Sequence, residues 1–366
     1  MEIRRIKKSE WDKILSFNTK EYRSDHILIN KVYYDWQFDN VFNNDHDLYT
    51  SLGLFDQKEE LAGTIGLFPA PCNFFGQSAK CNWITNLIVK ENLRSLGYGY
   101  LLLKEAERRA DVAIDHNINQ VAVPLFTKSG WRGEDIKRFI CVLDSINSEK
   151  VIGKSDLRLR TFKNYNHTFG SEWSAGLVDG CGPEFDEFWD EIKSKYPFSI
   201  DRSSAYLNWR YAHNPLVKYF ILVSRQGNRV VSFIVIRIEP ITQGPERADT
   251  DIKVGRIIDF ISTNEAEEYA LLEAVRFCGN KEVDFMDFFF TGNFHKEALN
   301  KIGFMDCDIA PYSKMPTLLN PIDRTKRTKH NFAVKLLNDS LGKKTGGLNL
   351  GDLYTTKGCG DQDRPY

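Results

Sequence analysis

The change from a strand to a helix after residue 83 limits most strongly what this chain can fold into. The apolar run 83–89 has the length and composition of a buried strand. The helix that follows has apolar residues at three- and four-residue spacing, namely Leu103, Ala106, Ala110 and Ala113. Between the two stand Arg94, Gly97 and Gly99, in the order Arg-x-x-Gly-x-Gly. A strand that enters a helix through such a loop indicates a domain in which sheet and helix pack together.

The loop also suits an anionic ligand. A helix N-terminus carries about half a positive charge and several unpaired backbone N–H groups. Gly97 and Gly99 let a ligand approach those amides, and Arg94 can add a charge-assisted hydrogen bond. A tight strand-to-helix turn that needs glycine only for its backbone conformation is the alternative interpretation.

The order of the predicted elements is seen twice. The first half has a helical segment at 8–18, an aromatic segment at 32–42, strands at 49–55, 61–70 and 80–89, the helix after Gly99, and a short buried strand at 119–126. The second half has a helix at 183–196, a strand pair within 219–239, a strand at 255–262, and then helix, strand and helix at 265–278, 283–290 and 294–304. The fold class predicted is α/β (α+β), with two tandem domains of residues 1–150 and 151–366, each a mixed, mostly antiparallel sheet flanked by helices.

Composition narrows the class of protein. The chain has 366 residues, of which 42% are hydrophobic, and this length favours two domains. Its net charge of −1 gives no overall attraction to nucleic acid. Seven cysteines without a C-x-x-C pair indicate reduced thiols. With no signal peptide and no apolar run of about 20 residues, we expect a cytoplasmic protein without membrane insertion. No metal-ligand spacing is present, so no metal is expected.

In this setting the Arg94-x-x-Gly97-x-Gly99 string resembles the acyl-CoA signature of the GNAT N-acyltransferases, which follows their fourth strand. The segment "GTIGLF" stands where that family has its third strand, and the resemblance covers residues 45–135. A dinucleotide-binding β-α-β unit is disfavoured because the preceding strands form an antiparallel hairpin. The resemblance implies acyl-CoA as cosubstrate and a GNAT-like fold for both domains.

The resemblance also assigns residues to the cosubstrate. Amides in the segment Ser95, Leu96, Gly97, Tyr98, Gly99 and Tyr100 would hold the pyrophosphate, with Arg94 beside them. The backbone of Leu87 and Val89 would pair with the pantetheine arm where the fourth and fifth strands separate. An amide near Leu87 or Ile88 would polarise the thioester carbonyl. Lys128 and Trp131 would line the same groove.

One departure concerns the catalytic base. Many family members carry a glutamate on the fourth strand, where this chain has Thr85 and Asn86. An amide cannot take a proton, so Asn86 occupies the position of the family's glutamate without being the base. The base lies elsewhere or is water. Our candidate is Asp259, in the strand 255–262; pairing with Arg256 or capping a loop is its alternative role. Other candidates for base are His116, His213 and His295, with Asp284 and Asp287 as rival carboxylates.

The acceptor is predicted from two strings. The second half lacks the glycine motif and has an acidic segment instead, so it is free to hold the acceptor. "DRSSAYLNWRYAHNPLVKY" (201–219) and the ending "GCGDQDRP" (358–365) resemble tandem GNAT enzymes that acylate nucleotide-linked amino sugars in surface-polysaccharide (O-antigen, lipopolysaccharide) biosynthesis. The residues predicted to bind this substrate are Arg202, Tyr206, Trp209, Arg210, Tyr211, Asp361, Asp363 and Arg364. A structural role for the first string and a frayed tail for the second are the alternatives.

Three functions follow as hypotheses. The first is transfer of an acyl group from acyl-CoA to the amine of a nucleotide-linked sugar, with a dTDP-linked sugar as first choice, by direct attack. The second is a peptidoglycan-type aminoacyl transfer from aminoacyl-tRNA, which the near-neutral charge and the intact loop disfavour. The third is a non-catalytic acyl-CoA sensor. A homodimer is a further expectation.

Overall fold

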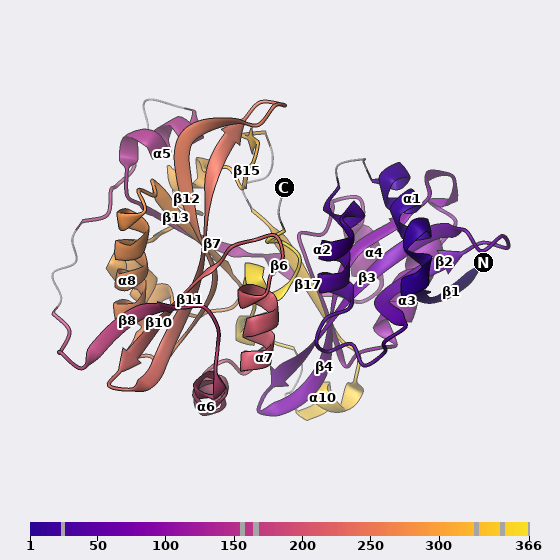
Figure 1. Cartoon of the computed structure of the whole chain (residues 1–366), viewed down its shortest axis with the longest axis horizontal. Helices are drawn as coiled ribbons and strands as arrows, with labels where there is room; N and C mark the ends of the chain where they lie inside the picture. Colours follow the sequence, from indigo (N-terminus) through magenta and orange to yellow (C-terminus); the bar gives the residue numbers. More distant parts are fainter. Residues whose placement is uncertain (23–25, 154–157, 164–167, 326–328, 345–347, 365–366) are drawn as a thin grey trace.

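The structure is a computed structural model that describes residues 1–22, 26–153, 158–163, 168–325, 329–344 and 348–364. Most strands belong to two large sheets that lie next to each other, and helices cover their faces (Figure 1). Both sheets mix parallel and antiparallel pairs. This arrangement confirms the predicted fold class of mixed sheets flanked by helices.

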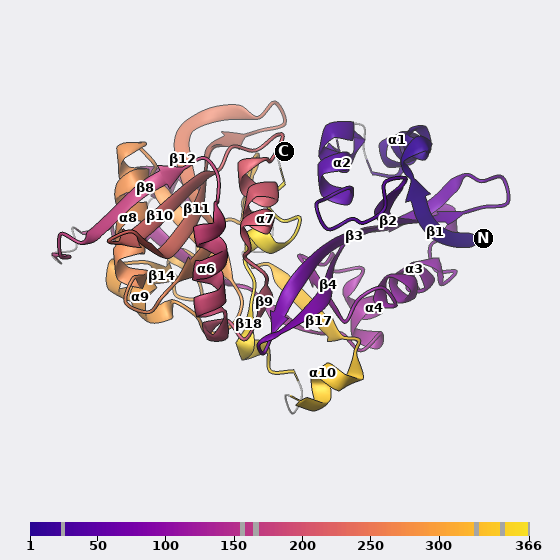
Figure 2. The same ribbon diagram turned by 60° about the horizontal axis from the view of Figure 1, so that its bottom comes forward.

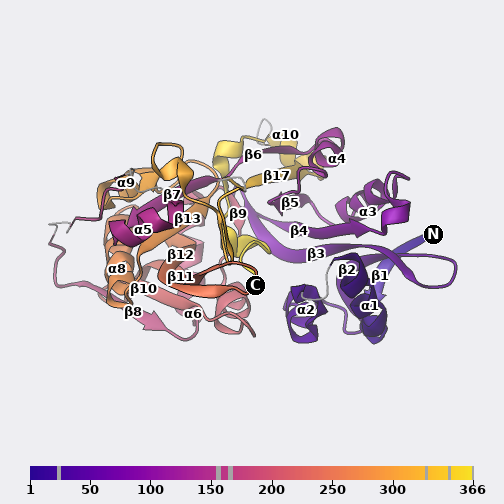
Figure 3. The ribbon, with the colours of Figure 1, turned by 90° about the horizontal axis from the view of Figure 1, so that it is seen from above.

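The first sheet has the order β1-β2-β3-β4-β5-β17-β6. Its strands are β1 (Glu2–Lys7), β2 (Leu48–Phe55), β3 (Leu61–Phe74), β4 (Gln77–Val89), β5 (Val112–His116), β6 (Arg132–Asp135) and β17 (Asn331–Leu336), and β9 (Phe198–Ile200) joins β3 to β18 (Leu353–Tyr354). Its helices are α1 (Trp11–Glu21), α2 (Lys31–Phe38), α3 (Tyr98–Glu107) and α4 (Val123–Lys128), with short 3₁₀ turns at Lys8–Glu10, Ile27–Ile29 and Glu91–Leu93. Figure 3 shows α1 and α2 on one face of this sheet and α3 and α4 on the other.

The second sheet has the order β14-β7-β13-β12-β11-β10-β8. Its strands are β7 (Lys137–Val142), β8 (Trp173–Val178), β10 (Phe220–Gln226), β11 (Arg229–Gln243), β12 (Ala248–Ser262), β13 (Phe285–Phe290) and β14 (Met305–Asp306). Around it lie α5 (Ser145–Ile152), α6 (Pro183–Ile192), α7 (Ser204–Leu207), a π-turn at Asn208–Ala212, α8 (Glu267–Asn280) and α9 (Lys296–Ile302). The remaining elements are β15 (Leu318–Leu319), β16 (Ile322–Asp323), α10 (Asp339–Lys344) and 3₁₀ turns at Lys193–Lys195, Tyr312–Lys314, Leu350–Asp352 and Lys357–Cys359.

The two sheets repeat one motif. β3, β4 and β5 form an antiparallel pair followed by a parallel pair, with α3 as the crossover. β11, β12 and β13 do the same, with α8 as the crossover. β12 is therefore the counterpart of β4, as expected from the sequence.

The sheets exchange strands along the chain. β7 follows β6 directly but pairs with β13 in the second sheet, whereas β17, from the C-terminal part, pairs with both β5 and β6. Strands from residues 1–150 therefore occur in both sheets. The boundary at residue 150 stays a prediction for the division into domains.

One predicted strand is wrong. The segment expected as a strand at 119–126 contributes to α4, and the strand of that region is β5, at 112–116. Pro124 stands in the first turn of α4, where its missing N–H costs no hydrogen bond. The residues before Pro124 are Val and Ala, a composition typical of strands. The tertiary packing of the segment nevertheless makes it helical.

The largest of the buried hydrophobic clusters extends across both halves. The largest buried cluster includes Trp83 of β4, Tyr206 of α7 and Phe260 of β12. Between α2 and the π-turn, the indole N–H groups of Trp36 and Trp209 each donate to the backbone carbonyl of the other residue, at 3.0 Å. Figure 2 shows β9 and β18 in the seam between the sheets. The sheets are thus joined by packing, hydrogen bonds and exchanged strands.

Candidate functional site

The Arg94-x-x-Gly97-x-Gly99 string forms an open loop before α3. Gly97 caps α3 with a left-handed φ of 85° and offers no side chain to the first amides of the helix. A Cβ on Gly97 would meet nothing within 4 Å, and one on Gly99 would meet only Leu125 Cδ2, at 3.9 Å. The amides of the first turn have no intrahelical acceptor. The loop therefore presents free backbone donors to an approaching anion, as a pyrophosphate cradle requires.

The side chains of the loop leave that approach open. Ser95 has a positive φ of 70°, and Leu96 and Tyr100 are 63% and 46% exposed. Arg94 is exposed, and its Nε donates to the carbonyl of Val89 at 3.1 Å, so the guanidinium is held beside the end of β4. The residues predicted for the pyrophosphate thus lie together in this loop and in the first turn of α3.

β4 separates from β5 next to this loop. The two strands pair only from Cys81 to Trp83, with Val112 to Ile114 as partners. Beyond that point β4 continues to Val89 with a bulge against β3, where Asn86 has a φ of 51°. Leu87 and Ile88 are half-buried and Val89 is buried. A strand edge without a neighbour on the β5 side is the geometry that an extended pantetheine arm would use.

The two residues predicted beyond this edge differ in position. Lys128 is exposed at the end of α4. Trp131 is 5% exposed, its indole N–H donates to Glu107 Oε1 at 2.8 Å, and its ring packs edge-on against Phe126. It contributes chiefly to the core beneath α3 and α4, and its edge lines a cavity of about 390 Å³ that also includes Thr127 and Asn331. The prediction that Trp131 lines the CoA groove is therefore not supported by its packing.

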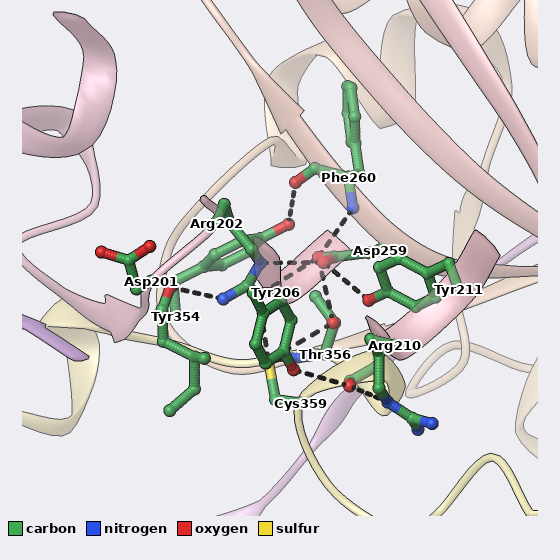
Figure 4. Close-up of polar contacts among 12 residues, drawn as sticks. Asp201, Arg202, Tyr206, Arg210, Tyr211, Asp259, Phe260, Tyr354, Thr356 and Cys359 are labelled. Carbon is green, nitrogen blue, oxygen red and sulfur yellow. Dashed lines mark hydrogen bonds and ion pairs between the residues drawn. The ribbon is translucent and has the colours of Figure 1, made fainter. Parts of the chain in front are cut away.

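Asp259 lies at the centre of a buried polar cluster (Figure 4). Its carboxylate accepts from Arg202 Nε at 2.8 Å and Nη2 at 3.2 Å. It also accepts from the Tyr211 hydroxyl at 2.8 Å, the Thr356 hydroxyl at 3.1 Å and the Phe260 amide at 3.1 Å. The side chains of Asp259 and Arg202 are 0% exposed. This environment stabilises a carboxylate that does not exchange protons with a ligand.

Two predicted roles are corrected by this cluster. A base must reach the proton it removes, and Asp259 is enclosed with its oxygen atoms already paired. Arg202, predicted to bind the acceptor, is committed to Asp259 and to the Cys359 thiol, at 2.9 Å from its Nη2. The sequence pointed to the correct strand but could not show that the C-terminal segment covers it.

The aromatic string after Arg202 holds that C-terminal segment. The Tyr206 hydroxyl donates to the Gly358 carbonyl at 3.0 Å. Arg210 donates to the same carbonyl at 2.7 Å and to the Gly360 carbonyl at 2.8 Å. Tyr206, Trp209, Arg210 and Tyr211 are all buried. The predicted acceptor-binding role of these four residues is replaced by a structural one, because their polar groups bond the tail, Trp36 and Asp259.

The end of the tail is ordered against both sheets. Asp363 is buried and accepts from the Tyr219 hydroxyl at 2.6 Å and Arg237 Nη1 at 3.0 Å. Asp361 accepts a hydrogen bond from the Thr85 hydroxyl, and Arg364 Nη1 donates to Asn86 Oδ1 at 3.3 Å. The described tail, up to residue 364, therefore reaches the bulge of β4, where the sequence lacks the expected glutamate.

A carboxylate that was not singled out from the sequence stands on β5, where this strand separates from β4. Asp115 follows Ile114, the last β5 residue paired with β4. Burial, and then the negative charge of Asp361, raise the pKa of Asp115 well above its usual value. The sequence predicts the strand of this region at 119–126, whereas β5 ends at His116. The end of β5, where Asp115 lies, was therefore not recognised as a position beside β4.

The remaining candidates for base are less suitable. Burial lowers the pKa of His116 to about 3, so it is neutral in the working range. His295 is buried and its Nδ1 lies 2.9 Å from Glu267. Asp287 is held by Arg138 and Arg256 at 2.8 and 2.9 Å. His213 is exposed beyond the π-turn.

Comparisons with known proteins agree with this geometry. Residues 10–131 match the model of the Acetyltransferase (GNAT) family. The match covers a third of the chain, and the fold as a whole, with its two GNAT-like sheets, is one that N-acyltransferases adopt. The comparison with curated proteins found no match.

Among solved structures, the chain resembles a GCN5-related N-acetyltransferase from Anabaena variabilis, with a TM-score of 0.58 and 10% identity over 93% of this chain and 74% of that one. A probable N-acyltransferase from Enterococcus faecalis gives a TM-score of 0.58 and 9% identity, over 93% and 73%. Saccharomyces cerevisiae N-myristoyltransferase, solved with bound myristoyl-CoA, gives 0.54 and 14%, over 91% and 82%. At these identities the likeness establishes the fold.

Neither a membrane-spanning helix nor a metal-binding group is found among the described residues. No helix among them combines the length and apolarity needed to cross a membrane. Within the same residues, no group of three or more His, Cys, Asp or Glu side chains has an arrangement that could hold a metal ion.

Proposed function

We propose that the protein transfers an acyl group from acyl-CoA to a primary amine, with both substrates meeting at the bulge of β4. The observation that carries this proposal is the open loop at Gly97 beside the separated edge of β4. The loop would hold the pyrophosphate, and the edge would hold the pantetheine arm. The thioester would then lie next to Thr85–Asn86.

The chemistry requires three things of the protein. The acceptor ammonium must lose a proton before its nitrogen attacks the thioester carbonyl. An N–H group must stabilise the oxyanion of the tetrahedral intermediate, and we assign the amide of Leu87 or Ile88 to this role. The C–S bond then breaks, CoA leaves as a thiolate that takes up a proton, and the amide remains on the acceptor. No covalent enzyme intermediate is needed.

For the acceptor we propose a nucleotide-linked amino sugar, with a dTDP-linked sugar as first choice. The support is the resemblance of the strings 201–219 and 358–365, together with the finding that these strings contact each other through Arg210 and Gly358. The residues of the first string that were predicted to bind the acceptor are buried. The predicted residues left to meet an acceptor are therefore in the tail, in particular Asp361 and Arg364. Asp363 stays a candidate through its position next to them.

The test is an assay for free thiol. Acetyl-CoA and larger acyl-CoAs are each incubated with amino-sugar nucleotides, and release of CoA is followed with a thiol reagent. We expect release only when a sugar with a free amine is present. The matched control is the same nucleotide sugar with a hydroxyl in place of the amine. Release that depends on aminoacyl-tRNA would favour the second hypothesis, and tight CoA binding without turnover would favour a sensor.

A further inference from the structure

We propose that the base of this reaction is carried by the C-terminal tail: Asp361, held at the bulge of β4, accepts the proton of the acceptor ammonium. This inference rests on the acyl transfer proposed above. It replaces the buried Asp259 with a carboxylate at the bulge of β4.

A ring of polar contacts fixes Asp361 at the bulge. The Thr85 hydroxyl donates to Asp361, and Asn86 Nδ2 donates to the Thr85 Oγ1 at 2.8 Å. Arg364 donates to Asn86 Oδ1 at 3.3 Å and lies 3.6 Å from the Asp361 carboxylate. The four side chains join the tail to the one segment of β4 that lies beside the proposed thioester position. Asp361 is partly exposed, so an acceptor amine can reach it.

Asp115 is a second carboxylate in this region of the fold. It is the first residue of β5 beyond the parallel pairing with β4, so it stands where the two strands separate, and it is partly exposed. Burial, and then the negative charge of Asp361, raise its pKa well above its usual value. The hydrogen bonds at the bulge hold Asp361, so Asp361 is the carboxylate that we assign to proton removal.

One buried polar atom near Asp361, the hydroxyl of Tyr22, has no hydrogen-bond partner within the described residues. The charges of Arg364 and Asp361 act on Tyr22. Buried polar groups are rarely left unpaired, so this hydroxyl indicates a polar ligand or ordered water at the site. An acceptor with hydroxyl groups, such as a sugar, would satisfy it.

The proton balance is simple. The ammonium gives one proton to the Asp361 carboxylate and becomes the neutral amine that attacks the thioester. After the C–S bond breaks, the proton passes to solvent or to the leaving thiolate. Asp361 contacts Thr85 of β4 and Arg364 of the tail, and its charge acts on Asp115 of β5, on Tyr22 just after α1 and on Tyr33 of α2.

The experiment compares Asp361→Asn, Asp115→Asn and Asp361→Glu with the wild type, and uses Asp352→Asn, in the same C-terminal region, as the matched control. We expect Asp361→Asn to lower kcat by about 10²- to 10⁴-fold without a change in the affinity for CoA. Asp115→Asn should lower kcat much less than Asp361→Asn, and Asp361→Glu should recover part of the rate. An acceptor amine of low pKa, already neutral at pH 7, should lose much less rate in Asp361→Asn.

The outcomes separate this inference from the proposed function. If the wild type releases no thiol with any amine, the proposed function is wrong and the inference falls with it. If the wild type is active and Asp361→Asn stays within about threefold of it from pH 6 to 9, the inference alone is overturned. Circular dichroism and CoA binding show whether each variant is folded. A fall in rate that is equal for neutral and charged amines would also contradict a role in proton removal.

Discussion

The environment of a single carboxylate decides between chemistry and structure in this protein. Asp361 belongs to the C-terminal tail, and Asp259 is hydrogen-bonded to Thr356 just before it. Asp259 is enclosed by Arg202 and two hydroxyl groups, whereas Asp361 lies at the edge of β4 and is partly exposed. A buried ion pair contributes little net stability, but removal of one partner leaves an uncompensated charge. Asp259 thus belongs to the set of residues that fix the seam between the sheets.

Asp259→Asn tests that assignment. The substitution keeps the shape and leaves the guanidinium of Arg202 buried without its counter-charge, so we expect a loss of about 3–5 kcal/mol in the free energy of unfolding. The kcat of the folded fraction should stay within about tenfold of the wild type. Urea denaturation and the thiol assay measure the two effects. A loss of kcat above about 10²-fold with unchanged stability would restore Asp259 as the base.

Gly97 gives a second prediction at the scale of one residue. Its φ of 85° is unfavourable for a β-branched residue, and the side chain would stand over the amides of α3. We expect Gly97→Val to weaken CoA binding by at least about tenfold, a loss of roughly 1.4 kcal/mol. Gly76→Val is the matched control, because Gly76 has a φ of 81° and equally open surroundings in the β3–β4 turn. Calorimetry should show normal CoA affinity for the control.

Lys357 should make stability depend on pH. Burial, and then Arg256, lower its pKa to about 7, with Asp287, Asp363 and Glu239 acting in the opposite direction. In the unfolded chain its pKa is about 10.4, so between about pH 7 and 10 the unfolded state binds the extra proton and stability rises with pH. Below pH 7 both states are protonated and the folded state bears the full cost of the buried charge.

Lys357→Met therefore should raise the Tm at pH 6 by roughly 3–10 °C and lose this advantage near pH 10. Thermal unfolding followed at pH 6, 8 and 10 measures the difference. The exposed Lys281→Met is the control and should leave the pH dependence unchanged. A Tm of Lys357→Met below that of the wild type at pH 6 would mean that the charge is compensated in the folded state.

At the scale of elements, the C-terminal tail acts as part of both sheets. β18 pairs with β9, the Gly358 and Gly360 carbonyls satisfy Arg210, and Asp361 reaches β4. Glycine is required at 358, where a Cβ would lie 2.0 Å from the Tyr211 hydroxyl. The sequence predicted a role in acceptor binding for this segment, but its glycines and charges suggested an exposed loop and not a buried one.

Truncation after Gly358 separates the roles of the tail and the loop. It removes the Gly360 carbonyl from Arg210 and Asp363 from Arg237, so we expect a loss of stability of several kcal/mol. It also removes Asp361, so kcat should fall by at least about 10²-fold. The affinity for CoA should be unchanged, since the cradle lies at the N-terminus of α3. Calorimetry with CoA checks this, and a shift above tenfold would place the tail in the CoA site.

How well each element could be predicted from the sequence depends on how local its signal is. The antiparallel pairs β2–β3 and β10–β11 were predicted because their turns and alternation are local. The loop at Gly97 was predicted because its residues are contiguous. β5 was misplaced because five residues between two helices give a weak signal. Asp115 was missed with it.

At the scale of the whole molecule, what the sequence could not show is pairing over long separations. The pairing of β17 with β5 and β6 joins residues more than 190 positions apart, and no local pattern specifies it. The same holds for Asp361 and Thr85, which are 276 positions apart. Two tandem domains could be predicted from the repeated order of elements, whereas the exchange of strands and the buried tail depend on the tertiary fold.

The exchange predicts how fragments behave. Residues 1–150 alone lack β17, which leaves β5 and β6 without their common partner, and retain β7, whose Phe139, Ile140 and Cys141 are buried in the whole chain. Unpaired edges and exposed apolar strands favour aggregation. We expect this fragment to aggregate or to unfold without a cooperative transition, whereas the full chain should unfold cooperatively.

A designed fragment provides the control. Asp135 of β6 pairs with Asn331 of β17 in an antiparallel register, so a short turn can join residues 1–135 directly to 331–337. This fragment restores β17 and omits β7, and it should be more soluble and should melt more cooperatively than residues 1–150. Urea unfolding followed by tryptophan fluorescence and circular dichroism measures both. Equal cooperativity in the two fragments would mean that residues 1–150 fold without β17, so that the exchanged strand stabilises the sheet without being needed to form it.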